Sequence, residues 1–333
     1  MKIIITTIFI FSIYFVNAQD IHFSQYFYSP LNLNPANTGN FDGDWRVVNN
    51  YRNQWKALSI PYRTIGIRYE HQFYIFTEQL SYGIDVINDK SGPAGLTVNK
   101  LFGSIAYHKK IESHHLHFGM QGGMVFKSYS LDQLTFPSQF DMTSGYFNNQ
   151  LSNNETNLIS NINYPDLNLG ILWQKQMRLI QTELGFSAYH LIMPKESFNN
   201  DNNKLPIRYA VYGGINIPIK SFYFKPQLFE MRQHKATDLI MGIEAGFNLQ
   251  NAPIGIKRLF GGFFTRNDFN TAFDASIFML GIQIKQLQLA FSYDINTSPL
   301  SVATNKKGAF EFSLIYTSKS TIPKKITLPC DRM

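Results

Sequence analysis

Residues 287–295 read Leu-Gln-Leu-Ala-Phe-Ser-Tyr-Asp-Ile, and apolar side chains occupy every second position of this stretch. Successive side chains of a β-strand point to opposite faces of the sheet, so the stretch predicts a strand with one apolar face and one polar or small face. The same alternation recurs in residues 309–316, 239–247 and 116–124. A period of two is therefore the dominant pattern of this chain.

Extending this pattern along the chain predicts about fourteen strands of roughly ten residues, the length that a tilted strand needs to cross a bilayer. We place them at residues 45–57, 62–74, 78–88, 97–110, 115–128, 166–176, 180–190, 206–217, 221–232, 237–248, 256–265, 273–283, 286–295 and 309–318. Bacterial single-chain barrels close with even numbers of antiparallel strands. The sequence therefore predicts an all-β fold, a transmembrane antiparallel β-barrel over residues 45–318.

The lengths of the predicted connections support the same fold. The even-numbered connections are short, whereas several odd-numbered ones are long and polar, at residues 88–96, 131–165, 191–205 and 296–308. With a periplasmic N-terminus, the odd connections lie outside the cell and the even ones inside. Long outer loops and short inner turns are typical of outer-membrane barrels, so we expect both termini in the periplasm.

Charged residues of the clearest strands fall on the polar face. They are Asp238, Glu244, Asp294 and Glu311. A Lys or Arg on a lipid face at mid-membrane costs roughly 2–4 kcal/mol, so this sorting is what a membrane barrel needs. A soluble sandwich or a lipocalin-like barrel also shows alternation. So many one-sided strands, however, leave apolar surface that only lipid would cover.

Residues 1–18 have the pattern of a secretory signal peptide. Lys2 supplies a short positive region, residues 3–16 supply an apolar core, and Ala18–Gln19 is the expected cleavage site. A membrane anchor is the alternative, which the shortness of the apolar run disfavours. The single cysteine, Cys330, cannot form an internal disulfide and could only pair between chains.

Residues 19–44 form an extended segment between the signal peptide and the first predicted strand. Pro30 and Pro35 remove backbone donors and push the preceding residues towards extended geometry, so we expect neither a helix nor a barrel strand here. The segment is too aromatic for a disordered linker. Its apolar anchors are Phe23, Tyr26, Phe27 and Tyr28. We expect it to form a plug in the lumen or at the periplasmic mouth, and residues 319–333 to form a periplasmic tail.

The sequence offers no clear catalytic, cofactor or metal site. The formal net charge of +7 is spread along the chain, without the basic runs that mark nucleic-acid binding. His115 and His117 share a strand face, as a two-ligand metal site needs, but no third ligand is identifiable. Ser187 and His190 could serve a membrane hydrolase, although residues three apart on a strand face opposite sides. We expect a non-enzymatic protein without a cofactor.

Several motifs resemble those of the PorP/SprF family, outer-membrane proteins of the type IX secretion and gliding machinery of Bacteroidetes. The matching residues of the N-terminal segment are Phe23, Gln25, Pro30, Leu31, Asn34, Pro35 and Gly39. A second signature covers Tyr51, Arg52, Gln54 and Trp55, a third covers residues 83–92, and a C-terminal pair of strands includes Tyr293, Asp294 and Glu311. The run Ala309-Phe310-Glu311 departs from the family, in which a His before the Glu is common, and so does the end of the chain after Cys330.

This resemblance implies an accessory barrel in the outer membrane that works with the type IX secretion machinery. Members help to secrete, or to hold at the surface, a large adhesin, or they link the machinery to the outer membrane. The expected partners are the adhesin or its C-terminal signal, other type IX components and outer-membrane lipid, and the motif residues are the candidate contacts. The translocation channel itself is another, larger protein. A diffusion porin or ligand transporter is the main alternative, and a membrane hydrolase is the second.

Overall fold

The computed structural model describes residues 20–321, apart from residues 21, 55–59, 93, 131–133, 155–158, 200, 250–251, 269–270 and 299–300. The predicted signal peptide with its Ala18–Gln19 cleavage site, Trp55 of the second signature, Cys330 and all of the tail beyond Thr321 lie outside the described residues.

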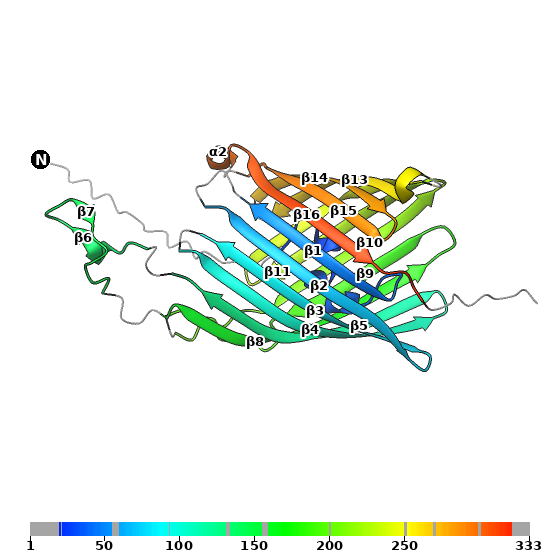
Figure 1. The fold of residues 1–333 in the computed structure, drawn as a ribbon, viewed down its shortest axis with the longest axis horizontal. Helices are drawn as coiled ribbons and strands as arrows, with labels where there is room; N and C mark the ends of the chain where they lie inside the picture. Colours follow the sequence, from blue (N-terminus) through cyan, green and yellow to red (C-terminus); the bar gives the residue numbers. More distant parts are fainter. Residues whose placement is uncertain are drawn as a thin grey trace, which may run out of the picture.

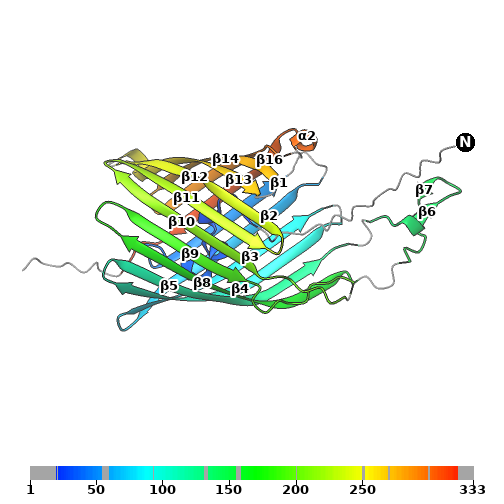
Figure 2. The ribbon, with the colours of Figure 1, turned by 180° about the vertical axis from the view of Figure 1, so that it is seen from behind.

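Fourteen strands form one closed antiparallel barrel, in which β1 pairs with β16 (Figure 1). In barrel order they are β1 (Trp45–Gln54), β2 (Tyr62–Ile75), β3 (Glu78–Ser91), β4 (Leu96–Ile111), β5 (His114–Ser128), β8 (Asn161–Gln176), β9 (Gln181–Tyr189), β10 (Arg208–Ile219), β11 (Phe222–Gln233), β12 (Ala236–Asn248), β13 (Ile256–Asp268), β14 (Thr271–Ile284), β15 (Leu287–Asn296) and β16 (Lys307–Thr317). A separate hairpin of β6 (Phe140–Asp141) and β7 (Tyr146–Phe147) stands away from the barrel (Figure 2).

The predicted fold is therefore confirmed, and every predicted strand is present. The largest difference is β8, which we predicted to begin at residue 166 and which begins at Asn161. The ladder continues past Pro165, which faces Met124, up to the pair of Ser128 and Asn161. Proline lacks one ladder donor, but the residues on either side of it still pair with β5.

The barrel wall is apolar outside and polar inside. In β15 the side chains of Phe291 and Tyr293 are 46% and 41% exposed, whereas Ser292 and Asp294, which alternate with them, are buried. The pattern holds around the ring, where large apolar residues are exposed and charged ones are buried. A soluble protein has the opposite arrangement, so the outer wall is a surface for lipid. Among the described residues, no helix is long and apolar enough to cross a membrane.

The two ends of the barrel differ in their connections. One end, called the short-turn end below, carries links of two to four residues after β2, β4, β8, β10 and β14, and a link of seven residues, 249–255, after β12. The other, called the long-connection end, carries the longest links, which follow β5, β9 and β15. It also carries a link of seven residues, 55–61, after β1 and links of two to four residues after β3, β11 and β13. The predicted gathering of long connections at one end is thus seen in the strand bounds. The predicted long connection at residues 88–96 is wrong, because β3 runs to Ser91 and β4 begins at Leu96. That the short-turn end faces the periplasm stays an expectation.

The N-terminal segment contains short helical turns, which corrects our expectation that it forms no helix. The helix α1 (Pro30–Leu33) and a 3-10 turn (Pro35–Asn37) each begin at one of the two prolines. Proline suits the first helical position because its missing N–H needs no partner there and its φ already fits the helix. Asn34, between them, is extended as predicted, with φ −164° and ψ 125°.

Candidate functional site

The segment before β1 lies inside the barrel and crosses it from end to end. We call residues 20–44 the lumenal segment. At its start, Asp20 accepts from Lys100 Nζ at 2.5 Å and from an Arg208 guanidinium nitrogen at 2.8 Å, near the long-connection end. Its end, Asp44, leads into β1 at the short-turn end. The segment therefore runs the length of the lumen.

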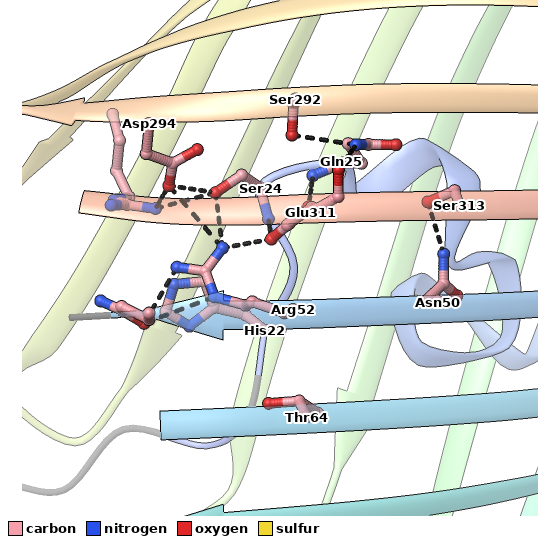
Figure 3. A network of polar contacts seen from close by, with 12 residues as sticks. His22, Ser24, Gln25, Asn50, Arg52, Thr64, Ser292, Asp294, Glu311 and Ser313 are labelled. Carbon is pink, nitrogen blue, oxygen red and sulfur yellow. Dashed lines mark hydrogen bonds and ion pairs between the residues drawn. The ribbon is translucent and has the colours of Figure 1, made fainter. Parts of the chain in front are cut away.

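A group of buried charges holds the first part of the segment to β1, β15 and β16 (Figure 3). The Glu311 carboxylate accepts the backbone N–H groups of Ser24 and Gln25 at 2.7 and 2.8 Å. The Asp294 carboxylate accepts the Ser24 hydroxyl at 2.6 Å. Arg52 pairs with Glu311 and also donates to the Ser24 hydroxyl at 2.7 Å. We call Arg52, Asp294, Glu311 and the neighbouring Arg266 the charged clamp.

The clamp balances its own charge. Arg266 lies 3.2 Å from Asp294 and also contacts Asp274 at 2.8 Å. Arg52, Asp294 and Glu311 are almost completely buried. Burying a lone carboxylate costs several kcal/mol, and pairing with cations and hydrogen-bond donors offsets that cost. Because two of the donors are backbone N–H groups of the segment, an empty barrel would lose part of this compensation.

Three consecutive aromatic residues pack against the part of the wall that β11, β12 and β13 form. The Tyr26 ring stacks on Phe229 with ring centroids 4.7 Å apart, and Phe27 lies 5.2 Å from Phe264. The Tyr28 hydroxyl donates to Glu244 at 2.9 Å. Aromatic pairs add about 0.5–1.5 kcal/mol each beyond the area that they bury. The predicted apolar anchors therefore contact inward-facing residues of β11, β12 and β13.

The proline-containing part touches the backbone of the wall. The Asn34 side chain accepts from Ala36 N at 2.8 Å and donates to the carbonyl oxygens of Ile171 and Phe186 at 3.0 and 3.1 Å. A Cβ at Gly119 on β5 would lie 2.2 Å from the Pro35 carbonyl carbon. Glycine in the wall is thus what lets the segment approach this closely.

A second carboxylate binds the end of the segment near the short-turn end. Glu70 on β2 accepts the backbone N–H of Gly39 at 2.9 Å and pairs with Arg46 at 2.8 Å. Gly39 has φ 73°, a left-handed conformation that glycine adopts without steric cost. Carboxylates that accept backbone N–H groups therefore hold both ends of the lumenal segment.

Space remains in the lumen between the segment and the short-turn end. A cavity of 520 Å³ has Tyr26, Phe27 and Leu33 on one side, and a neighbouring cavity of 340 Å³ is bordered by Phe27 and Tyr28. The barrel side of these cavities is rich in amides and paired charges, including Gln79, Gln174, Gln181, Glu183, Lys225 and Gln227. Such a lining can donate to and accept from a polar chain, but it holds no reactive pair.

Most of the predicted contact residues meet at the lumenal segment. The seven N-terminal motif residues, Phe23, Gln25, Pro30, Leu31, Asn34, Pro35 and Gly39, are all buried. Arg52, Asp294 and Glu311 bind the segment directly, and Gln54 accepts from Arg52 at 3.0 Å. Tyr51 and Tyr293 instead lie on the outer face, because they alternate with the inward Arg52 and Asp294.

Several residues of the site escaped prediction from the sequence. They are Ser24, Asn50, Glu70, Lys100, Arg208 and Arg266. The available signal was strand parity, since a charged residue on an inward position needs a partner in the lumen. Nothing in the local sequence says which partner it meets.

The residues considered for catalysis and metal binding have structural contacts. The Ser187 hydroxyl donates to the Leu33 carbonyl oxygen at 2.9 Å, and His190 Nδ1 lies 2.8 Å from Asp166. His117 meets His108, with 2.5 Å between the two Nδ1 atoms. Across the part of the chain that the structure describes, no group of three or more His, Cys, Asp or Glu side chains could hold a metal ion.

Comparisons with solved structures show the fold. The toluene transporter TbuX of Ralstonia pickettii superposes with a TM-score of 0.51 at 9% identity, over 88% of this chain and 93% of that chain. The monoaromatic hydrocarbon channel CymD gives 0.51 at 8% identity, over 89% and 94%. A search among curated protein sequences found no match. The sequence model of one family, described as type IX secretion system membrane protein PorP/SprF, matches residues 15–316.

Proposed function

This chain belongs to the PorP/SprF family of type IX secretion system membrane proteins, and we propose that it is a non-enzymatic accessory barrel whose lumen is closed by its own N-terminal segment. In this role it helps to secrete or hold a large surface adhesin, or it links the machinery to the outer membrane. Its family implies contacts with other components of the machinery. The adhesin, its C-terminal signal and outer-membrane lipid are the further partners that we propose.

The observation that carries this proposal is the buried attachment of the lumenal segment. Asp20 at one end and Gly39 at the other are both bound to the wall, and between them Tyr26 and Phe27 pack against Phe229 and Phe264. Solute would have to displace a segment that is hydrogen-bonded at both ends. A scaffold can keep such a segment in place, whereas a diffusion porin needs a continuous aqueous path.

Deleting the gene and measuring surface adhesin tests this role directly. We expect surface display of the adhesin to fall, with the adhesin retained inside the cell or released into the medium. Restoring the intact gene should restore display. Normal adhesin display and normal motility in the deletion strain would refute the proposed function.

Planar-bilayer recordings separate the proposed role from a porin or ligand transporter. The purified barrel should show no steady conductance. A variant that lacks residues 20–39, with the signal peptide retained, should show steady conductance if it folds, which its heat-modifiable mobility on a gel would report. Steady conductance of the intact barrel would favour the porin instead.

A further inference from the structure

The hairpin that joins β2 to β3 extends beyond the rim of the barrel at the short-turn end (Figure 1). The first residue of β1, Trp45, pairs with His71, and Asp44 accepts from Gln72 N at 2.9 Å. Residues Phe73–Ile75 then pair only with β3. We call residues 73–79 the rim hairpin. Among the described residues, no strand pairs with this extension of the wall on its β1 side.

The rim hairpin is apolar and exposed on both faces. Phe73, Tyr74 and Ile75 are 37%, 46% and 49% exposed, and Phe76 at the tip is 99% exposed. Tyr74 lies four residues after the buried Glu70 on the same strand, so both side chains are on the lumen-facing side of the wall and not on the lipid face. Apolar side chains that project from the lumen side of a rim into water are not explained by contact with lipid.

The residue at the tip is also unusual for its turn. Phe76 is the first residue of a two-residue turn and has φ 55°. The equivalent positions of the turns after β4, β10 and β14 are Glu112, Lys220 and Lys285, with φ 52°, 54° and 51°. A left-handed conformation disfavours a bulky aromatic residue, so the turn itself does not call for phenylalanine. Lysine in the same geometry shows that a charged residue is accepted there.

The base of the hairpin is bonded to β4, and its tip stands beyond aromatic residues of the outer wall. Glu78 at its base accepts from Lys109 Nζ at 2.6 Å and from the Tyr107 hydroxyl at 2.5 Å. The tip is five residues beyond His71, which is roughly 17 Å along a strand. Outer aromatic contacts such as Trp45 with Tyr316 lie behind that point. The tip is thus placed in the aqueous phase rather than at the lipid boundary.

From these observations we propose that the rim hairpin is a docking element for a soluble protein of the secretion machinery. The partner has an apolar pocket that receives Phe76 and Tyr74, bordered by carboxylates that face the exposed Lys110 on the adjacent strand β4. Gln79 at the base of the hairpin lines the 520 Å³ cavity, so a docked partner stands at the entrance to the lumen. The identity of the partner as a machinery component rests on the proposed function.

Photo-crosslinking in intact cells tests the contact. With p-benzoylphenylalanine at position 76, we expect an adduct with a soluble protein that mass spectrometry assigns to the machinery. The matched control carries the same residue at position 220, in a turn of the same conformation, and should give no such adduct. Adducts with lipid alone, no adduct, or equal adducts at both positions would overturn the proposal.

Phe76→Lys tests the energetics without disturbing the turn, because lysine occupies the equivalent place in two other turns. We expect the amount of partner that co-purifies with the barrel to fall about tenfold or more, as for loss of a buried aromatic anchor. Leu179→Lys, at another short turn where the side chain is 70% exposed, should retain the partner. Unchanged retention with Phe76→Lys would contradict the inference.

Adhesin display in the same strains keeps the two proposals apart. If the gene is needed for display but Phe76→Lys neither loses the partner nor reduces display, the docking element is wrong and the function stands. If the hairpin binds the partner but deletion of the gene leaves display normal, the function is wrong and the docking element stands.

Discussion

Two parts of the lumenal segment are held to the wall by different interactions. At the long-connection end, Ser24 and Gln25 meet a buried group of two carboxylates and two arginines. Further along, Asn34 and Pro35 lie against the wall backbone, with glycines where the two chains touch. The first attachment depends on matched charge and the second on shape. The charged attachment is weakened when one partner is removed, whereas the close-packed attachment is weakened when a larger side chain is introduced.

Breaking the charged clamp should have the largest effect. Glu311→Gln leaves the buried Arg52 with only the more distant Asp294, at 3.7 Å, which should lower the free energy of unfolding by about 3–5 kcal/mol. Urea unfolding of the barrel in detergent, followed by intrinsic fluorescence, measures this. Glu230→Gln, which alters a half-exposed carboxylate 3.5 Å from Arg232, should cost no more than about 1 kcal/mol. If both changes lowered the free energy of unfolding equally, the buried clamp would contribute no more to stability than a half-exposed ion pair.

Adding one methyl group tests the packed part. Gly119→Ala places a Cβ 2.2 Å from the Pro35 backbone, so the segment must shift at a cost of roughly 1–3 kcal/mol. Gly122→Ala, on the same strand with its nearest neighbour at 3.7 Å, should be close to neutral. Hydrogen exchange of residues 34–38 should rise in the first variant alone. If both variants behave alike, the close approach at Gly119 does not hold the segment.

Removing an amide gives a smaller loss. Asn34→Ala removes the acceptor of Ala36 N and the donor to Ile171 and Phe186, for an expected cost of about 1–2 kcal/mol. Asn40→Ala, on a half-buried residue later in the segment, is the control. Urea unfolding under the same conditions checks both variants, and a neutral Asn34→Ala would remove this residue from the attachment.

The smallest effect concerns an exposed carboxylate of the same kind. Hydrogen bonds from the Thr321 hydroxyl and backbone N–H hold the pKa of Asp44 below its ordinary value. A lowered folded pKa means that the carboxylate stabilises the fold above its unfolded pKa, near 3.9. That contribution disappears as the pH falls through the lower folded pKa. The protection of the Thr321 amide, measured as its exchange rate relative to the intrinsic rate at the same pH, should therefore fall below about pH 4. In Asp44→Asn this protection should not change with pH in that range.

The strands and their facing could be predicted because alternation is local. Asp294 and Glu311 were assigned to the polar face from their neighbours alone, and both point inward. The contacts could not be predicted, since Ser24 and Glu311 are 287 residues apart in the chain. Alternation also places Tyr293 on the apolar face, and its ring lies there, on the opposite side of the wall from Asp294. Membership of one signature therefore does not mean that both residues contact the segment.

The helical turns of the lumenal segment could not be predicted either, because the effect of a proline depends on its surroundings. Pro30 predicts an interruption of regular structure, whereas at the first position of a helix proline favours helix formation. Which of the two applies depends on whether the following residues can close a turn. Here they do so in the lumen, where Leu31 and Leu33 are buried against the wall.

The charged clamp also bears on how this barrel is assembled, because it joins both edges of the β1–β16 seam to the lumenal segment. Arg52 lies on the first strand and Glu311 on the last, and both bind the segment that precedes the first strand. If β1 paired with β16 around an empty lumen, the 25 residues of the lumenal segment would afterwards have to enter the closed barrel past bulky aromatic side chains. Closing the seam over a segment already lying across it avoids that passage and supplies the donors that Glu311 requires. Insertion of the barrel and docking of the segment are then a single step of biogenesis, with the segment acting as the template on which the two edges meet.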